Sequence, residues 1–337
     1  MTLHAYGLGI GRKSSDGRWL DVFFPKPVAE PDTKVAACFD GMDRCTTLDP
    51  LDLHALGEAL ANAGAAKDAA LTSRLADCES TPVLVLLPEN DAPQSVPEAY
   101  LKLHLLSHRS VKPHGTSLDG LFGLLPNVAW TGEGPIAIDE LPERQLTARL
   151  KGSFVVVDSV DKFPKMSDYV VPDGVRIADT ARVRLGAHIG VGTTIMHEGF
   201  VNFNAGTLGA GMIEGRVSAG VVVGANSDLG GGCSTMGTLS GGGDIVISIG
   251  ERCLLGANSG LGIPLGDRCT IEAGLYLTAG TKVALHDATG ALLDTVAARS
   301  LAGQSGLLFR RNSRSGTVEC LTNRTAIELN KALHAHN

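Results

Sequence analysis

Aliphatic residues recur at every sixth position through the middle of the chain. They run without error through five positions and resume after shifts of phase: Ile177, Val183, Ile189, Ile195 and Val201, then Val223, Leu229, Ile249, Leu255, Leu265, Ile271 and Leu277. A small residue usually stands four positions after each of them. A period of six fits neither an amphipathic helix nor an alternating strand. It is typical of the hexapeptide repeat of a parallel β-helix, in which three short strands and three turns form one triangular coil.

The same repeat predicts what fills each coil. The aliphatic residue points inward, and the small residue lies near a corner, where there is little volume. Cys233, Cys253 and Cys269 fall on this small position, so we interpret them as core residues rather than metal ligands. With three repeats to a coil, the pattern predicts about six coils.

Two interruptions break the phase of the repeat. Residues 235–248 form an insertion, which we expect to project from a coil, as functional loops on rigid repeats commonly do. The other is a slip around residues 213–223. It places two charged residues, Glu214 and Arg216, in a run of Gly, Ala and small apolar residues.

These two charges have alternative interpretations. If coils of eighteen residues continue through the slip, Arg216 lies over Glu198 and forms an ion pair on the outer face. Glu214 then lies over Met196 and gains no partner. It is either a carboxylate with a reactive role at a subunit interface or a solvated surface glutamate.

The flanking regions predict two further parts. Residues 1–152 mix helical and strand patterns and are expected to form an α/β domain, with helices in 48–64 and 95–109 and a buried strand in 81–89. The β-helix is assigned to residues 153–285. A small C-terminal extension follows in 286–337, with a strand and turn near 307–320 and a helix after it.

Composition narrows the class of protein. The net charge of −7 argues against a large nucleic-acid footprint. Seven scattered cysteines without a C-x-x-C pair indicate a reducing compartment. The N-terminus lacks an apolar signal region, and no apolar run has the length of a membrane span. We therefore expect a cytoplasmic protein without nucleic-acid or membrane partners.

Three familiar chemistries find little support. "GLGIG" at residues 7–11 resembles part of a dinucleotide loop, but no strand clearly precedes it. A phosphate-binding G-x-x-x-x-G-K-[ST] loop is absent from the sequence. His188 and His197 are nine residues apart, which does not match the H-x4-H pair of zinc-dependent carbonic anhydrases of this fold.

Long runs of the chain resemble one enzyme family. "DKFPKMSDYVVP", "GTTIMHEGFVNFNAGTLGAGMIEGRVSAGVVVG", "GGGCSTMGTLSGGGDIVISIG", "LLGANSGLGIPLGD" and "LLFRRNS" look like tetrahydrodipicolinate N-succinyltransferase, in the form found in pseudomonads and actinobacteria. "EAYLKLHLLSHRSVKPH" and "LFGLLPNVAW" extend the likeness into the N-terminal region. The resemblance implies a left-handed parallel β-helix, a homotrimer with sites between subunits, and succinyl transfer from succinyl-CoA to tetrahydrodipicolinate in lysine and diaminopimelate synthesis.

The resemblance also implies roles for individual residues. Glu214, in the M-I-E-G-R run, corresponds to a glutamate proposed to form an acyl-anhydride, and Gly237, in S-T-M-G-T, to a backbone donor to the oxyanion. From the residues alone, Glu214 is equally able to act as a general base. Contacts to succinyl-CoA carry over to Arg216, Gly231, Ser234, Ala257, Glu272, Ala273, Gly280, Arg310, Arg311, Asn312 and Ser313.

The sequence departs from the family pattern at two positions. Some members bind magnesium on the trimer axis through an Asp and a Glu; the Glu matches Glu198, but Ala181 replaces the Asp. A lysine of some members is Ala297 here. We therefore expect no cofactor beyond the co-substrate succinyl-CoA, with magnesium at Glu198 as the alternative.

Other functions remain open at this stage. An acetyl-CoA-dependent N-acyltransferase on the same fold would differ in whether Arg216 contacts a distal carboxylate of the donor. A catalytically inactive scaffold would not need the intact "IEGR" and "STMGT" runs. For the amine substrate, the outward-facing candidates are Arg184, Asn202 and Asn204.

Overall fold

The computed structural model describes residues 3–237 and 245–322, which form two compact units. One unit comprises Met1–Pro164 with Asp168–Val170, and the other comprises Lys165–Ser167 with Val171–Asn337. The boundary expected at residue 152 therefore lies later in the chain. The reason is that β8 (Val157–Asp161) pairs with a strand of the first unit and not with the β-helix.

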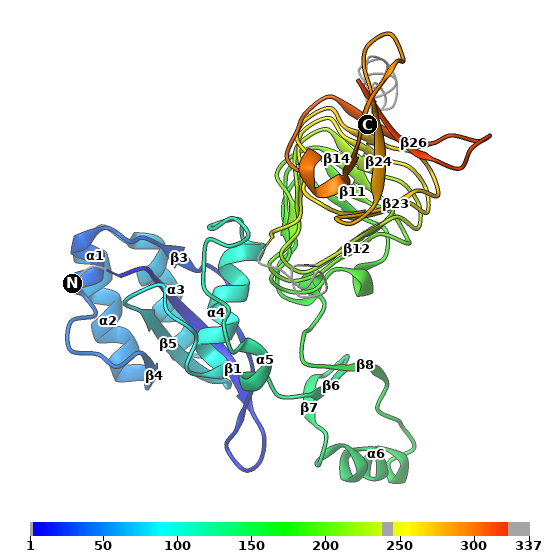
Figure 1. The fold of residues 1–337 in the computed structure, drawn as a ribbon. Helices are drawn as coiled ribbons and strands as arrows, with labels where there is room; N and C mark the ends of the chain where they lie inside the picture. Colours follow the sequence, from blue (N-terminus) through cyan, green and yellow to red (C-terminus); the bar gives the residue numbers. More distant parts are fainter. Residues whose placement is uncertain (1–2, 238–244, 323–337) are drawn as a thin grey trace. The chain divides into compact units, whose positions relative to one another are not determined.

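A five-stranded antiparallel sheet and its helices make up most of the first unit (Figure 1). Its order is β2-β1-β5-β4, with β3 beside β1. The strands are β1 (Ala5–Lys13), β2 (Trp19–Phe23), β3 (Val28–Ala29), β4 (Cys45–Thr47) and β5 (Thr81–Leu87). The helices are α1 (Thr33–Ala37), α2 (Pro50–Asn62), α3 (Ala66–Ala76), α4 (Val96–Ser107) and α5 (Leu121–Leu124). The predicted strand in 81–89 and the helices in 48–64 and 95–109 are confirmed as β5, α2 and α4.

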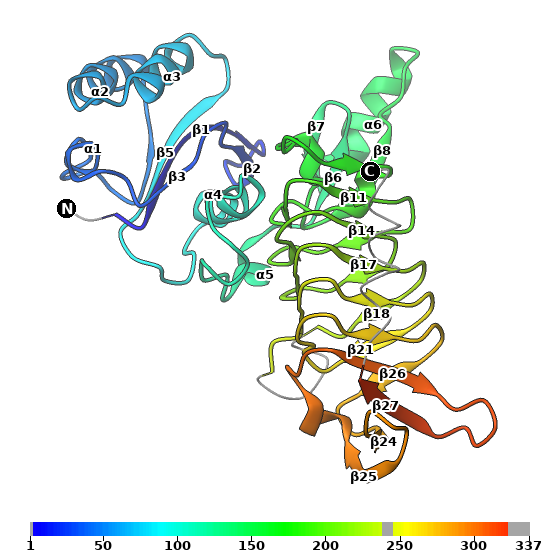
Figure 2. The ribbon, with the colours of Figure 1, turned by 90° about the horizontal axis from the view of Figure 1, so that it is seen from above.

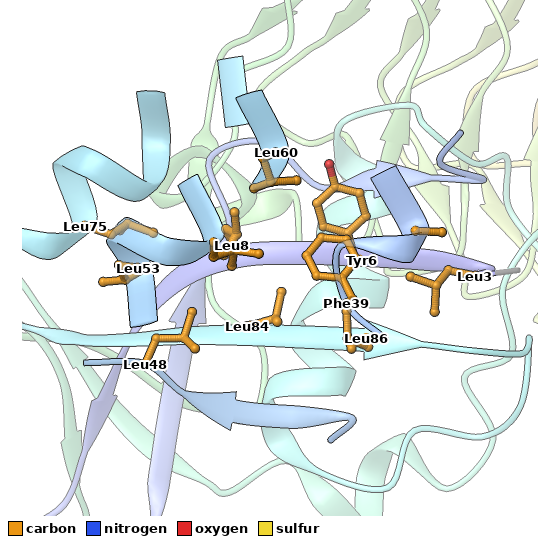
Figure 3. Close-up of a cluster of buried hydrophobic side chains, with 12 residues drawn as sticks. Leu3, Tyr6, Leu8, Phe39, Leu48, Leu53, Leu60, Leu75, Leu84 and Leu86 are labelled. Carbon is orange, nitrogen blue, oxygen red and sulfur yellow. The ribbon is translucent and has the colours of Figure 1, made fainter. Parts of the chain in front are cut away.

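One hydrophobic core of this unit lies between the sheet and the helices α1, α2 and α3 (Figure 3). Leu residues from α2 meet Leu84 and Leu86 of β5 there. The "GLGIG" run is an ordinary part of β1, and its glycines serve packing: a Cβ on Gly7 would lie 2.6 Å from Phe24 Cδ1. The dinucleotide interpretation is thereby excluded for this run.

Helix α4 carries a buried histidine. His104 Nδ1 lies 2.8 Å from the Tyr100 carbonyl, and its Nε2 accepts the Phe24 N–H at 3.3 Å. Burial lowers the pKa of His104 to about 3. The side chain is therefore a neutral imidazole, held by one donor and one acceptor.

A smaller sheet ends the first unit. Its order is β7-β6-β8, with β6 (Val128–Thr131) between β7 (Gly134–Ala137) and β8. Helix α6 (Leu141–Leu150) connects β7 to β8. Among the described residues, no helix combines the length and the hydropathy that a bilayer span requires.

The second unit is a parallel β-helix with three sheets, which confirms the fold predicted from the repeat (Figure 2). The β14 sheet contains β9 (Arg176–Ile177), β11 (Thr193–Ile195), β14 (Gly211–Ile213), β17 (Ser227–Leu229), β20 (Leu254–Leu255) and β22 (Thr270–Ile271). The β15 sheet contains β12 (Phe200–Val201), β15 (Arg216–Val217), β18 (Ser234–Thr235), β21 (Gly260–Gly262) and β23 (Tyr276–Thr278). The β16 sheet contains β10 (His188–Ile189), β13 (Gly206–Thr207), β16 (Val222–Val223) and β19 (Ser248–Ile249).

Buried aliphatic residues form columns inside the coils. Ile195, Ile213, Leu229, Leu255 and Ile271 stack in register along the β14 sheet, each almost fully buried. The three cysteines that the repeat places at the small inward position are also fully buried, as predicted: Cys233, Cys253 and Cys269. Half of the predicted insertion, residues 238–244, lies outside the described residues.

The C-terminal segment continues the β-helix instead of forming a separate layer. Strand β26 (Leu307–Arg311) pairs in parallel with β22, so that Phe309 stacks on Ile271. It then forms a hairpin with β27 (Val318–Thr322), as the predicted strand and turn required. The remaining strands of this sheet are β24 (Lys282–His286) and β25 (Leu292–Ala297). The helix expected after residue 322 lies outside the described residues.

Candidate functional site

Seven of the residues singled out in the sequence lie along one edge of the β-helix. After β14, β17, β20 and β22 the chain turns a corner toward the β15 sheet, and the stacked residues that precede these corners are in register from Ile213 to Ile271. Phe309 of β26 continues this column, and its strand goes on into the hairpin. The residues that follow them form what we call the Glu214 edge: Glu214, Gly231, Ala257, Glu272, Ala273, Arg310 and Arg311. Four ladder steps of about 4.8 Å separate its ends, so the edge is roughly 19 Å long.

The corner that holds Glu214 is shorter than the one before it. Ile195 pairs with Ile213, but Phe200 pairs with Arg216, so two residues have been lost between these rungs. The expected pairing of Arg216 with Glu198 is therefore wrong: Arg216 lies beside Phe200. Glu214 and Arg216 do not belong to one strand, because β14 ends before Glu214 and β15 begins at Arg216.

Cys233 lies directly behind this tight corner. A Cβ on Gly215 would overlap the Cys233 sulfur, so only glycine fits between Glu214 and Arg216. The Arg216 N–H also donates to the Cys233 carbonyl at 2.8 Å. Burial raises the pKa of the Cys233 thiol to about 12, with the Glu214 charge acting in the same direction and Arg216 opposing it. The thiol is therefore neutral at physiological pH.

Glu214 is half-buried and carries an uncompensated carboxylate. Its N–H donates to the Leu229 carbonyl at 2.8 Å, and its neighbour on the preceding rung is Met196, as predicted. Within the residues that the structure describes, the carboxylate has no hydrogen-bond or ion-pair partner. A Cβ on Gly231 would lie 3.5 Å from Glu214 Oε2, so the absence of a side chain there leaves the carboxylate open. Such a group can accept a proton or attack an electrophile.

Four further candidates lie at the ends of strands of the β15 sheet. Arg216 pairs with Ser234, so these two side chains begin neighbouring strands next to the Glu214 edge. Gly237 follows β18 and Gly280 follows β23, at the far end of the same sheet. Gly237 is three residues further along the chain than Ser234, which corresponds to roughly 10 Å of extended chain. Within one chain, Gly237 therefore does not lie beside Glu214.

The C-terminal hairpin supplies charged groups at one end of the Glu214 edge. The Arg311 N–H donates to Glu272 Oε2 at 2.7 Å, which brings two predicted residues together. Arg310 Nε donates to Glu319 Oε2 at 3.0 Å, and Asn312 Nδ2 donates to Glu319 Oε1 at 2.8 Å. The Asn312 amide and then Arg310 hold the pKa of Glu319 below its usual range. The charge of Arg310 is thus largely matched within the hairpin.

Comparison with known proteins gives full-length relatives. The chain is 62% identical to 2,3,4,5-tetrahydropyridine-2,6-dicarboxylate N-succinyltransferase of Pseudomonas putida over 100% of this chain and 99% of the relative. It is 58% identical to the protein of that name from Vibrio cholerae, over 100% of both. The chain belongs to this N-succinyltransferase family.

Family descriptions and a solved structure agree with this assignment. Residues 125–165 match the description "Tetrahydrodipicolinate N-succinyltransferase middle", and residues 246–279 match "Hexapeptide repeat of succinyl-transferase". A crystal structure described as a 2,3,4,5-tetrahydropyridine-2-carboxylate N-succinyltransferase from Campylobacter jejuni has a TM-score of 0.88 at 34% identity. The match covers 97% of this chain and 94% of the chain in that crystal structure. The β-helix is therefore the fold of this N-succinyltransferase family.

The candidates for the amine substrate are brought together only in part. Arg184 Nη1 donates to Asn202 Oδ1 at 3.2 Å, on the β15-sheet side of the first coils. Asn204 lies beyond them in a left-handed turn with φ of 53°, where its N–H donates to the Gly186 carbonyl at 2.8 Å. Arg184 and Asn202 thus lie on the same side of the β-helix as Arg216, whereas Asn204 lies in a corner of the coil.

Within one chain, the side chains near Glu198 do not form a set of magnesium ligands. Glu198 and Ala181 are both exposed, and a methyl group cannot coordinate a metal. The Arg182 guanidinium donates to the Glu198 backbone carbonyl at 2.8 Å, which brings a positive charge close to Glu198. Among residues 3–237 and 245–322, no group of three or more His, Cys, Asp or Glu side chains could hold a metal.

One exposed aromatic of the β15 sheet was not singled out from the sequence. Tyr276 begins β23 and is 51% exposed. The sequence did offer one sign of its importance. In a chain with 4% aromatic residues, an aromatic residue stands at an outward position of the repeat. The corner at Gly215 was visible in the sequence only as a loss of phase.

Proposed function

We propose that this chain transfers the succinyl group of succinyl-CoA to the amine of tetrahydrodipicolinate, in its open form 2-amino-6-oxopimelate, as a step of lysine and diaminopimelate synthesis. The relatives named above for this succinyl transfer match it over its whole length. The observation that carries the proposal is the Glu214 edge, where an open carboxylate stands at one end of a line of small residues and cationic side chains stand at the other.

The chemistry assigned to Glu214 has two forms. As a nucleophile, the carboxylate attacks the thioester carbonyl, the C–S bond breaks, and CoA leaves as a thiolate that takes up a proton. The amine then attacks the resulting anhydride and releases the carboxylate. As a general base, Glu214 instead takes the proton of the amine while the amine attacks the thioester directly. Both forms need a donor for the oxyanion, and we assign that role to the Gly237 N–H.

The donor is proposed to lie along the Glu214 edge. Gly231, Ala257 and Ala273 leave little bulk beside the backbone, so that an extended pantetheine arm can pass close to it. Arg311 and the other residues of the hairpin, Arg310, Asn312 and Ser313, then meet the CoA phosphates. Arg216 and Ser234 stand near the other end and hold the distal carboxylate of the succinyl group.

A homotrimer of left-handed β-helices completes this proposal. Because Glu214 and Gly237 lie at opposite ends of the β15 strands, one thioester cannot contact both within a single chain. A neighbouring copy that presents Gly237 to Glu214 would complete the site. We further propose that the enzyme acts in the cytoplasm, where CoA thioesters are available, and that the reaction uses no metal.

A thiol-release assay tests the proposed function. The purified protein is given succinyl-CoA or acetyl-CoA, each with and without tetrahydrodipicolinate. The proposal predicts release of CoA that requires the acceptor and is faster with succinyl-CoA. Faster release from acetyl-CoA would favour an acetyltransferase, and no release from either donor would contradict both enzymatic functions.

A further inference from the structure

The Tyr276 side chain lies flat across the neighbouring strand of the β15 sheet. Gly260 pairs with Tyr276 in the ladder between β21 and β23, and a Cβ on Gly260 would overlap the atoms of the Tyr276 ring. The ring therefore occupies the space that a side chain at position 260 would fill. Half of the tyrosine surface nevertheless remains exposed, at 51%.

Gly260 also determines the direction in which the ring points. The ladder runs from Tyr276 through Gly260 to Ser234 and then to Arg216. By lying over Gly260, the ring extends from the last strand of this sheet back toward Ser234. An aromatic side chain in this position presents one face to the sheet and the other to whatever covers the sheet.

The ring also borders the Glu214 edge. Glu272 and Ala273 turn the corner of the edge immediately before Tyr276, and on the preceding rung Ala257 turns the same corner before Gly260. The ring thus stands beside the stretch of the edge between Ala257 and Ala273. That stretch lies between Glu214 and the arginines of the hairpin. If the thioester is at Glu214 and the phosphates are at the arginines, the pantetheine arm that joins them passes this stretch.

We propose that Tyr276 is a substrate-contacting residue whose ring forms one wall of the path for the pantetheine arm of the acyl-CoA donor. The inference rests on the proposed function and adds a residue to it. A half-exposed aromatic face suits the apolar methyl groups and the amides of such an arm. Gly260 acts through Tyr276 as a positioning residue, because only a residue without a side chain lets the ring lie flat.

Donors of two lengths distinguish contact with the pantetheine arm from a general effect of Tyr276 on the reaction or on the fold. Succinyl-CoA contains the complete arm, whereas the succinyl thioester of N-acetylcysteamine keeps the reacting thioester and lacks the distal part of the arm. Tyr276→Ala and Gly260→Ala should each lower kcat/KM for succinyl-CoA about tenfold, which corresponds to about 1.4 kcal/mol, with kcat nearly unchanged. Tyr276→Phe keeps the ring and should keep the kinetics. For the short thioester, kcat/KM should be the same in all four proteins.

The matched control is Gly123→Ala, since a Cβ there meets no atom within 4 Å. Equal losses with both donors would contradict the inference, as would unchanged kinetics in Tyr276→Ala. A change in the mass of the assembly, measured by light scattering, would show instead that the ring serves a contact between copies. If the unaltered protein releases no CoA from succinyl-CoA, the proposed function itself fails, which is a different result from an active enzyme insensitive to Tyr276.

Discussion

Arg216 pairs with Phe200 in the ladder between β12 and β15, two positions from the residue that an unbroken repeat would give it. The loss of two residues at the corner of Glu214 has two effects. It separates Arg216 from Glu198, and it places Arg216 at the start of β15, while Glu214 stays in the corner. Among the described residues neither Glu214 nor Arg216 has a side-chain partner, so both groups remain open to substrate.

Arg216→Ala should therefore change the choice of donor. Loss of a charged hydrogen bond to the distal carboxylate should lower kcat/KM for succinyl-CoA about 10- to 100-fold and leave acetyl-CoA turnover unchanged. The measurement is steady-state thiol release with both donors. Arg176→Ala, an exposed arginine on β9 of another sheet, is the matched control. Equal losses with both donors would contradict the assignment of Arg216.

Glu198→Gln should leave both the activity and the melting temperature unchanged. The ladder places Phe200, not Glu198, beside Arg216, so no ion pair is lost when the carboxylate is removed. Differential scanning calorimetry and the thiol-release assay check this prediction. A clear fall in melting temperature would mean that the pairing at this corner has been assigned incorrectly.

The two arginines of the hairpin should differ in their effect on the donor. Glu319 accepts from Arg310 at 3.0 Å, whereas the Arg311 guanidinium donates to the neutral Gly316 carbonyl at 3.0 Å. Arg311→Ala should raise the KM for succinyl-CoA about tenfold, and Arg310→Ala by clearly less. The difference should shrink at high salt, because exposed charges are screened. A larger effect of Arg310→Ala would show that Glu319 does not neutralise it.

Cys233 should take no covalent part in the reaction, although it lies behind Glu214. With a pKa of about 12, only about one thiol in 10,000 is ionised at pH 8. Cys233→Ala should keep kcat within about threefold, since alanine suits the small inward position. Iodoacetamide should leave Cys233 unlabelled in the folded protein and label it after unfolding in urea. A succinyl adduct on Cys233 in mass spectrometry would contradict this assignment.

His104 should make the first unit less stable in mild acid. The pKa of His104 is about 3 in the folded chain, whereas the ordinary value of 6.5 applies to the unfolded chain. Below pH 6.5 the unfolded chain therefore binds a proton that the folded chain does not. Stability is thus complete above pH 6.5 and falls as the pH drops toward 3. Between pH 7 and pH 5, the protonation of His104 in the unfolded chain should lower the free energy of unfolding by about 2 kcal/mol.

Urea unfolding followed by tryptophan fluorescence measures this loss, because Trp19 and Trp130 both belong to the first unit. His104→Gln should reduce the loss between pH 7 and pH 5 by about that amount. His54→Gln changes an exposed histidine on α2 and should leave the loss as it was. An identical pH dependence in His104→Gln and the unaltered protein would contradict the neutral buried imidazole.

The sequence predicted the β-helix because its signal is periodic. Six-residue spacing identifies the coils, and the small inward position correctly places Cys233 in the core. The pairing of Arg216 was predicted incorrectly because pairing depends on the length of each corner, and a slip in phase does not reveal which corner has been shortened. Tyr276 was missed for a related reason: its position over Gly260 depends on a contact between rungs sixteen residues apart in the sequence.

Turnover by Glu214→Gln is the sharpest test of the catalytic role of Glu214. The variant keeps the shape of the corner and removes the charge, so its assembly should match that of the unaltered protein by light scattering. With succinyl-CoA and tetrahydrodipicolinate, CoA release should fall about 1,000-fold or more, as expected for the loss of an essential nucleophile or base. Turnover within about tenfold of the unaltered enzyme would contradict the catalytic role of Glu214.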